Sequence, residues 1–545
     1  DAIGWSSFED LTATQFADEV DEQHADYMLV DIEVDEDSGQ PVISGVWQEN
    51  VEGQFWGHHF NMTSSQFHDQ WVQYRDDGYR LLDQESYLLG GQRYYAGIWI
   101  ENQEGYDWAS IRNETDTEFS SRLASYQDDF ILIDFEAYPA GGSTLYAGAW
   151  VENVDDLQWI LHRDLTASEF SDYLDGYQDS YRVHDLESYQ VGDSQRYAAI
   201  WIENNNNRAW SYEHDLDEQE YQNHWRRYRD MGYRLVDFEE YQSGSDMKYA
   251  GVWRQNSDRP DWELRTSIDD IAANHLEDGD IPGLSVAVVH QGDIKYMRGF
   301  GHQDIDDNVW YSAHTINRLA SVSKAIGGVL LLKLADQGII DPAAATRDYV
   351  PPMPVHHTHT LEQLTANNGG IGHYSELGLG TMTTQYDTAL EASELFWDEP
   401  LVGVPGASYS YSTHGYTLLG AGIEGATGQS IADVLDAELG SGLGLETLRA
   451  ENRDEANEYR TSLYNTNNSE ATADNISWKL LGGGMEASAY DLARFSGMLM
   501  DGEILSQVAL EQLWTVPESN TSYAMGWSVG TLQGEFSIRK DGSQR

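Results

Sequence analysis

The sequence contains three Ser-x-x-Lys patterns, a spacing that can pair a nucleophilic hydroxyl with an amine base. They are Ser245…Lys248, Ser321…Lys324 and Ser537…Lys540. Residues i and i+3 are neighbours on a helix but point to opposite faces of a strand. Ser245 lies in a predicted turn and Ser537 in a predicted strand, whereas Ser321 begins an apolar helix predicted over residues 324–337. We therefore expect Ser321 and Lys324 to react as a pair. For an isolated match, a capping serine and a surface lysine would be the alternative.

The residues that follow Lys324 favour base chemistry. They include Ile326, Val329, Leu330 and Leu331, and burial among such side chains favours the neutral form of an amine. The amino end of the same helix offers a backbone N–H and a positive dipole to a developing oxyanion. These features predict nucleophilic catalysis by Ser321.

Two further segments complete a set of three motifs. Tyr411-Ser412-Thr413 precedes an apolar run, and Lys540-Asp541-Gly542 ends a predicted final strand. In type and order, the three motifs resemble those of the penicillin-recognising serine hydrolases, which comprise class C β-lactamases, D-Ala-D-Ala peptidases and family VIII carboxylesterases. The resemblance covers about residues 265–545.

The resemblance implies a role for each motif residue. Ser321 would attack a carbonyl carbon, Lys324 and Tyr411 would exchange its proton, and Lys540 would support substrate charge. The backbone N–H groups of Ser321 and Ser543 would form the oxyanion hole. Thr413, Asp541 and Gly542 would contact the substrate. Because two neighbouring cations lower the pKa of a phenol, we expect Tyr411 to serve as a base near neutral pH.

The motifs also depart from the family pattern. Thr413 stands where many members have Asn, and Asp541 replaces the usual Thr. The resemblance also implies further strands and a terminal helix beyond Arg545, so we expect this domain to lack its last strands and that helix.

The first half of the chain is an internal repeat. Five Asp residues, each ending a five-residue segment that begins with Tyr or Phe, follow one another at intervals of 52, 51, 51 and 52 residues. They are Asp31, Asp83, Asp134, Asp185 and Asp237. Two series of Trp keep the same intervals, one from Trp47 to Trp253 and the other from Trp56 to Trp262. Three registers in step indicate five copies of one structural unit.

Each repeat is predicted to contain a helix and about three strands. A capping box such as Thr63…Gln66 begins the helix, and a strand through the repeated Asp, a glycine turn and a second strand follow. The third strand is placed at the Trp56 register, after the other two. Such units must share a core, in a ring or a solenoid, and we favour a ring. Repeated aromatics are interpreted as core and repeated acids as turn caps, with a binding groove as the alternative.

The fold class is therefore α+β, with two domains. Residues 1–262 form the repeats, with a scaffold or substrate-recognition role, and residues 263–545 form a β-lactamase-like hydrolase domain. In the second domain we predict a helix near 268–275, a hairpin from the strand at 283–290, and a helix at 489–500. Closing strands are predicted at 524–530 and 535–540. Together they predict an antiparallel sheet flanked by helices.

The combination of repeats with such a domain resembles the polyglycine hydrolases, secreted endopeptidases that cut glycine-rich linkers. We therefore predict an acyl-serine endopeptidase acting on glycine-rich polypeptide, in a secreted or extracytoplasmic location. The alternatives are a carboxylesterase acting on small esters, a β-lactamase or D-Ala-D-Ala peptidase, and an inactive polymer-binding protein. The predicted partner is a peptide or ester substrate, and the oligomeric state stays open.

Amino-acid composition and charge limit which partners and which classes of enzyme fit the chain. Lys plus Arg total 31 against 93 Asp plus Glu, and the formal charge of −62 disfavours nucleic acid and acidic membranes as partners. The spread of acids suggests tolerance of high salt, and a start at Asp1 fits a processed, exported chain. There is no Cys and no His-Glu-x-x-His. The histidines of the segment Val355–His359 suggest a metal site, but a loop is favoured there, and no metal or cofactor is predicted.

Overall fold

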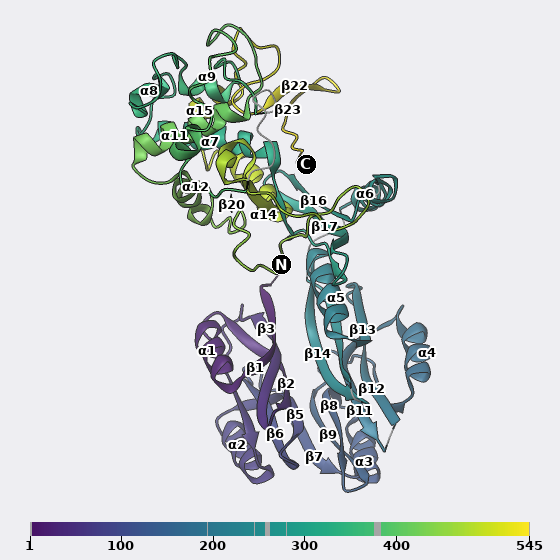
Figure 1. Cartoon of the computed structure of the whole chain (residues 1–545). Coiled ribbons are helices and arrows are strands. Elements are labelled where there is room, and N and C mark those ends of the chain that lie inside the picture. The colour runs from purple at the N-terminus through teal and green to yellow at the C-terminus, as the bar shows by residue number, and fades with distance from the viewer. Residues whose placement is uncertain are drawn as a thin grey trace. The chain divides into compact units, whose positions relative to one another are not determined.

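The computed structural model describes residues 3–192, 194–244, 246–256, 262–279, 281–374 and 383–543 (Figure 1). The chain divides into two compact units, Asp1–Asp261 and Trp262–Arg545. Ser245, which begins one of the Ser-x-x-Lys patterns, lies outside the described residues. Among the described helices, none is both long and apolar enough to cross a membrane.

Each of the five repeats consists of a strand, a helix and two more strands. The first strands are β1 (Trp5–Thr12), β4 (Trp56–Met62), β7 (Trp108–Glu114), β10 (Trp159–Leu165) and β13 (Trp210–Leu216). The helices are α1 (Ala13–Gln23), α2 (Ser64–Asp76), α3 (Asp116–Tyr126), α4 (Ala167–Tyr177) and α5 (Glu218–Asp230). The second strands are β2 (Tyr27–Asp37), β5 (Tyr79–Leu89), β8 (Phe130–Ala140), β11 (Tyr181–Val191) and β14 (Tyr233–Ser243). The third strands are β3 (Gln40–Glu49), β6 (Gln92–Glu101), β9 (Ser143–Glu152), β12 (Ser194–Glu203) and β15 (Asp246–Gln255).

The order of strands within a repeat differs from the prediction. The strand that was expected last precedes the helix, because Trp56 begins β4 and β4 pairs with β6 of the following segment. Each sheet has its third strand in the centre, as in the order β4-β6-β5. The predicted capping boxes are confirmed at the start of all five helices, as at Thr63 and Gln66.

The five repeats form a closed ring. The second strands β2, β5, β8, β11 and β14 contact one another in turn, and β14 returns to β2. Figure 1 shows helices α1 to α4 on the outer side of these strands. The first and fifth repeats are joined where Trp225 Nε1 donates to Ser7 Oγ at 2.7 Å and Asn256 Nδ2 donates to the Ile3 carbonyl at 2.7 Å. Each repeat thereby covers an apolar face of its neighbour.

The first series of repeated Trp residues is core, as predicted, whereas Trp108, Trp210 and Trp262 of the second series are partly buried. The five Trp side chains of the first series are at most 1% exposed: Trp47, Trp99, Trp150, Trp201 and Trp253. The interpretation of the repeated Asp residues as turn caps is wrong. Asp134 Oδ1 accepts the Gln84 backbone N–H at 3.1 Å, and Asp237 Oδ2 accepts that of Leu186 at 3.1 Å. These carboxylates join neighbouring repeats, because the second strand lies at the edge of its sheet and its Gln84 and Leu186 N–H groups are left for the next repeat.

The second unit begins with α6 (Arg265–Gly279) and the hairpin of β16 (Gly283–His290) and β17 (Asp293–Asp304). The described strands lie in three antiparallel sheets, in place of the single sheet predicted, with the orders β16-β17-β18, β19-β21-β20 and β22-β23. The remaining strands are β18 (Val309–Trp310), β19 (Ile316–Arg318), β20 (Arg449–Ala450), β21 (Met485–Ser488), β22 (Ser528–Leu532) and β23 (Glu535–Arg539). In the described part of the chain, no strand pairing joins one of these sheets to another: β19 pairs with β21, and β22 pairs with β23.

Helices pack around α7 (Ser323–Asp336), whose residues from Ser323 to Leu332 are all buried. The others are α8 (Thr346–Tyr349), α9 (Leu361–Thr365), α10 (Ala389–Ser393), α11 (Thr413–Thr427), α12 (Ile431–Leu439), α13 (Leu480–Gly483), α14 (Ala489–Met500) and α15 (Gln507–Leu513), with short 3₁₀ turns η1 (Ala320–Val322), η2 (Ser441–Leu443) and η3 (Ser477–Lys479). Helix α11 contacts α8, α9, α10 and α13, and its first turn faces α7. The amino ends of these two buried helices hold the candidate site.

Candidate active site

Ser321 lies in a tight turn between β19 and α7. The turn η1 contains Ser321, and α7 begins two residues later, so Ser321 precedes the helix that it was predicted to open. The Leu319 N–H donates to the Met485 carbonyl at 2.9 Å, and Ala320 has a φ of 46°. A left-handed conformation is costly for alanine, so the surrounding contacts must hold this turn in place.

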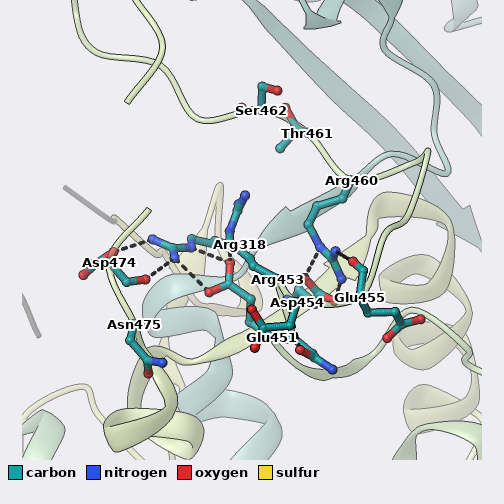
Figure 2. Close-up of polar contacts among 12 residues, drawn as sticks. Arg318, Glu451, Arg453, Asp454, Glu455, Arg460, Thr461, Ser462, Asp474 and Asn475 are labelled. Carbon is teal, nitrogen blue, oxygen red and sulfur yellow. Dashed lines mark hydrogen bonds and ion pairs between the residues drawn. The ribbon is translucent and has the colours of Figure 1, made fainter. Parts of the chain in front are cut away.

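An ion-pair network anchors the strand that leads into this turn (Figure 2). Arg318 donates to both carboxylate oxygens of Glu451, at 2.6 and 2.8 Å, and to Asp474 Oδ1 at 2.6 Å. The side chains of Arg318 and Glu451 are each 5% exposed. Arg453 donates to the same Glu451 at 2.7 Å. Such bidentate, buried pairing fixes the backbone three residues before Ser321.

Lys324 is fully buried beside Ser321. Its Nζ lies 3.3 Å from Ser321 Oγ and 3.1 Å from Thr413 Oγ1, and it also donates to the Gly482 carbonyl. Burial, together with the charges of Lys540 and Lys479, holds the pKa of Lys324 well below its usual value. A neutral amine has two N–H bonds, which suffice for Gly482 and Thr413 and leave its lone pair for the Ser321 hydroxyl. Lys324 can therefore act as the base.

Tyr411 completes the contact with the Ser321 hydroxyl. Its OH lies 2.6 Å from Ser321 Oγ, and the Lys324 and Lys540 amines lie 4.9 and 5.4 Å from the centre of its ring. The predicted lowering of its pKa is wrong, because burial raises the pKa of Tyr411 above its ordinary value and outweighs the hydrogen bond with Ser321. A neutral Lys324 also supplies no charge to lower it. This geometry makes Lys324 the candidate base and Tyr411 a candidate proton relay.

The start of α11 holds Tyr411 and Thr413. Ser412 caps this helix, since its Oγ accepts the Gly415 N–H at 3.0 Å, and its own N–H donates to Asn367 Oδ1 at 3.0 Å. Thr413 is buried, and its hydroxyl is engaged by Lys324 while its N–H donates to His373 Nδ1 at 3.2 Å. Within the structure, Thr413 positions Lys324. Its predicted contact with substrate stays a prediction.

The third motif reaches the nucleophile through Gly542. A Cβ placed on Gly542 would lie 2.5 Å from the Leu319 carbonyl oxygen and 3.1 Å from Ser321 N, so only glycine fits there. Lys540 Nζ donates to Tyr523 OH at 3.3 Å. Burial lowers the pKa of Lys540 to about 8, against the opposing charge of Asp541. Asp541 within this motif and Ser543 just after it are exposed. The predicted substrate contact of Asp541 and the predicted oxyanion role of the Ser543 N–H stay predictions.

Three residues of the site belong to none of the three sequence motifs. Tyr523 contacts Lys540, Lys479 adds positive charge near Lys324, and His373 packs edge-on against Tyr411 with ring centres 5.5 Å apart. One signal was available in composition. The chain has six lysines, and three of them, Lys324, Lys479 and Lys540, meet at this site. Scarcity of a residue type can therefore mark a functional position.

The histidines of the 355–359 segment form hydrogen bonds within the protein. His357 and His359 are buried, and His357 Nδ1 lies 3.0 Å from His359 Nε2. The other ring nitrogens contact the Trp397 carbonyl at 2.7 Å and Thr346 Oγ1 at 2.9 Å. This arrangement engages every ring nitrogen of the pair. Within the described residues, no group of three or more His, Asp or Glu side chains is arranged to hold a metal ion.

Comparison with known proteins covers both units. The β-lactamase family model matches residues 268–544. A second model, described as a polyglycine hydrolase-like structural repeat, matches residues 2–50, 53–102, 105–153, 157–204 and 207–256. The two models together account for most of the chain.

Curated relatives and solved structures match parts of the chain. The chain is 32% identical to protein flp of Staphylococcus aureus over 174 residues, which are 31% of this chain and 34% of flp. It is 24% identical to the human mitochondrial serine β-lactamase-like protein LACTB over 342 residues, covering 46% of this chain and 62% of that protein. The chain thus spans less than two thirds of either relative. Among solved structures, the D-amino acid amidase of Ochrobactrum anthropi aligns with a TM-score of 0.47 at 20% identity, over 52% of this chain and 84% of that one.

Proposed function

From the premise that the chain belongs to the β-lactamase family, whose members are serine hydrolases, we propose that it is an endopeptidase that cleaves glycine-rich polypeptide through an acyl-enzyme on Ser321. One observation carries the choice of substrate. All five repeats match the structural repeat of polyglycine hydrolase-like proteins, and they precede a domain in which Ser321, Lys324 and Tyr411 are in contact. The repeats then serve as a scaffold or as a recognition surface for the polypeptide.

The first half of the reaction uses the contacts of Ser321. As Ser321 Oγ attacks the carbonyl carbon, a C–O bond forms and the hydroxyl proton passes to the neutral amine of Lys324. The carbonyl electron pair moves to its oxygen, which the N–H groups of Ser321 and Ser543 would stabilise. When the C–N bond breaks, Lys324 returns the proton through Tyr411 to the leaving nitrogen. The distance of 2.6 Å between Tyr411 OH and Ser321 Oγ supports this relay.

The second half repeats these steps with water. Lys324, neutral again, takes a proton from water through Tyr411 as the water oxygen attacks the acyl carbon. The C–O bond to Ser321 breaks, and Ser321 recovers its proton. The burial that lowers the pKa of Lys324 supports a base that returns to its neutral form after each half-reaction.

A small-ester carboxylesterase is the second candidate. Thr413 stands where many penicillin-recognising enzymes have Asn, and its hydroxyl and N–H are both engaged within the protein. Threonine has no side-chain amide to replace that of Asn in recognising a β-lactam, and its hydroxyl is already engaged, which favours peptides and esters over β-lactams. An ester needs less help at its leaving group than an amide, so the same residues would hydrolyse it.

The test is mass spectrometry of a peptide with a polyglycine linker, incubated with the wild type and with Ser321→Ala, beside a p-nitrophenyl ester and a chromogenic β-lactam. We expect cleavage within the glycine run by the wild type alone. Ester hydrolysis without peptide cleavage would replace the proposal by the carboxylesterase. Cleavage by both proteins would exclude Ser321 as the nucleophile.

We further propose that the protein acts outside the cytoplasm and tolerates high salt. The formal charge of −62 supports the salt tolerance, because a dense carboxylate surface stays hydrated where salt screens its repulsion. Ester hydrolysis measured from low to high salt should keep its rate. Loss of activity at high salt, with the fold retained, would contradict salt tolerance, and cell fractionation tests the location.

A further inference from the structure

The junction between the fourth and fifth repeats holds a group of four arginines. Arg182 lies near the start of β11, Arg234 near the start of β14, Arg254 near the end of β15, and Arg208 in the loop before β13. These strands meet at the junction, because β11 contacts both β14 and β15. The chain has 93 acidic residues against 31 basic ones, so its composition does not predict four neighbouring arginines.

Direct contacts place three of these arginines side by side. Arg234 and Arg254 stand opposite each other on paired strands, an arrangement in which like charges repel. Arg254 Nη2 donates to Asn206 Oδ1 at 3.1 Å, and the backbone N–H of Arg208 donates to the same oxygen at 3.3 Å. Arg208 therefore lies next to Arg254, and Arg254 lies next to Arg234.

The four side chains act on one another electrostatically. Burial, followed by repulsion from Arg254 and Arg234, lowers the pKa of Arg182 to about 9. Burial, followed by repulsion from Arg254 and Arg208, lowers the pKa of Arg234 to about 10. Both guanidinium groups still carry their proton near neutral pH, so the cost remains in the folded protein as repulsion. An anion placed between them would offset that cost.

No acidic side chain of the described residues neutralises this group. None of the four guanidinium groups forms an ion pair with a carboxylate within the part of the chain that the structure describes. Arg182 Nη1 donates instead to His184 Nδ1, and Arg234 Nη1 donates to Asn256 Oδ1, each at 3.3 Å. The Nε atoms of Arg234 and Arg254 are buried with no hydrogen-bond partner among the described residues. Burying such donors without an acceptor is costly.

The other repeats show that the fold does not require these charges. The positions of Arg182 and Arg254 are occupied by Ile131 and Ile202 at the junction of the third and fourth repeats, where both isoleucines are buried in one apolar cluster. At no other junction are both of these positions basic in the sequence. The paired arginines are therefore a property of this junction and not of the repeat.

The loop beside the arginines is neutral where the equivalent loops are acidic. Its third residue is Asn206. The same position is acidic in the other four repeats, which have Glu52, Glu104, Asp155 and Asp258 there. In the second repeat, the charge of Glu104 opposes the effect of burial on Arg80, the equivalent of Arg182. Asn206 supplies no such charge to Arg182, so this junction lacks the anionic neighbour of the second repeat.

We propose that this junction binds a small tetrahedral oxyanion of the phosphate or sulfate class, held by Arg182, Arg208 and Arg254 with Arg234 beside them. Guanidinium groups donate pairs of parallel hydrogen bonds to oxyanions. A tetrahedral ion offers oxygens in several directions, which suits donors that come from different strands and a loop, whereas a carboxylate offers oxygens in one plane. The formal charge of −62 repels long polyanions, so the ligand is a free ion or a single phosphoryl or sulfo group. Bound there, it links the fourth and fifth repeats.

The first test uses the full chain in sodium chloride at fixed ionic strength. Inorganic phosphate, inorganic sulfate, glycerol phosphate and acetate are added separately and followed by calorimetry and thermal unfolding. We expect saturable binding of phosphate or sulfate, with an unfolding temperature that rises with the concentration of the anion. Binding of glycerol phosphate as well would identify a group carried on a larger molecule, and its failure to bind would identify a free ion. Absence of saturable binding of both inorganic anions, or equal binding of acetate, would overturn the proposal.

A pair of matched variants locates the site. Arg182→Ile with Arg254→Ile gives this junction the residues that the ring already uses between its third and fourth repeats. We expect phosphate binding to weaken ~10-fold or more, because two charge-assisted donors are removed. The control, Arg75→Gln with Arg122→Gln, removes two exposed charges from the same unit and should leave binding unchanged. Equal effects of the two pairs would mean diffuse binding and would refute the site.

A measurement on the wild type serves if the isoleucine variant does not fold. Phenylglyoxal modifies arginine side chains, and peptide mass mapping gives the rate of modification at each position. We expect phosphate to slow the modification of Arg182, Arg208 and Arg254 and to leave the rates at Arg75 and Arg122 unchanged. Equal protection of both groups of arginines, or protection of neither, would overturn the proposal.

Discussion

Replacing Gly542 with alanine tests how closely the third motif must approach the nucleophile. The added Cβ would lie 2.5 Å from the Leu319 carbonyl oxygen, whereas ordinary contacts begin at 3.4 Å. The gap between the motif and the Ser321 turn must therefore widen by about 0.9 Å, and a misplacement of about 1 Å at a reacting centre costs ~100-fold in rate. We expect kcat/KM for ester hydrolysis to fall ~100-fold, which is ~2.7 kcal/mol of transition-state stabilisation.

The assay combines ester hydrolysis, the rate of Ser321 acylation by a fluorophosphonate, and thermal unfolding. Gly530→Ala, in β22 of the preceding hairpin, is the control, because a Cβ there meets no atom within 4 Å. We expect this control to retain the wild-type rates and both variants to keep the wild-type unfolding temperature within a few degrees. Equal acylation rates for Gly542→Ala and the wild type would refute the close approach.

Three further predictions concern charge. If the Lys540 ammonium supports substrate charge, kcat/KM should fall as the pH rises through about 8, the pKa to which burial lowers it, and Lys540→Met should remove that limb of the pH profile. Glu451→Gln should cost ~3–5 kcal/mol in the free energy of unfolding, measured with urea, because it leaves Arg318 buried and only partly paired; a change below ~1 kcal/mol would contradict the network's role. Burial lowers the pKa of His359 to about 3, so the unfolded chain binds the extra proton, and stability should be complete above pH ~6.5 and fall toward pH 3. His359→Asn should show a weaker loss in thermal unfolding over that range, and an equal loss would be evidence against this histidine as the cause.

Local patterns in the sequence were sufficient for the repeats and for the main contact of the site. The spacing of Trp47 and its equivalents indicated one unit five times, and the capping boxes located all five helix starts. The choice of Ser321…Lys324 over the other two matches rested on helix geometry, and the structure places the two side chains 3.3 Å apart. These features depend on residues close together in the chain.

What depends on distant residues was predicted less well. The pKa of Tyr411 was assigned the wrong direction because the sequence shows nearby cations but not that burial makes Lys324 neutral. The sequence showed that Asp134 and its equivalents recur at one position of each repeat. It did not show that each contacts the neighbouring repeat, because that contact depends on closure of the ring. Tyr523 lies 17 residues before Lys540, a separation that no motif encodes.

Activation of Ser321 by a neutral Lys324 is the central claim, and covalent labelling tests it most directly. The wild type and Lys324→Met are treated with a fluorophosphonate at neutral pH, and the modified residue is located by peptide mass mapping. The account predicts an adduct on Ser321 in the wild type and a loss of labelling rate of ~100-fold or more in Lys324→Met, with the fold retained. An adduct on another residue, or equal labelling of the two proteins, would contradict it.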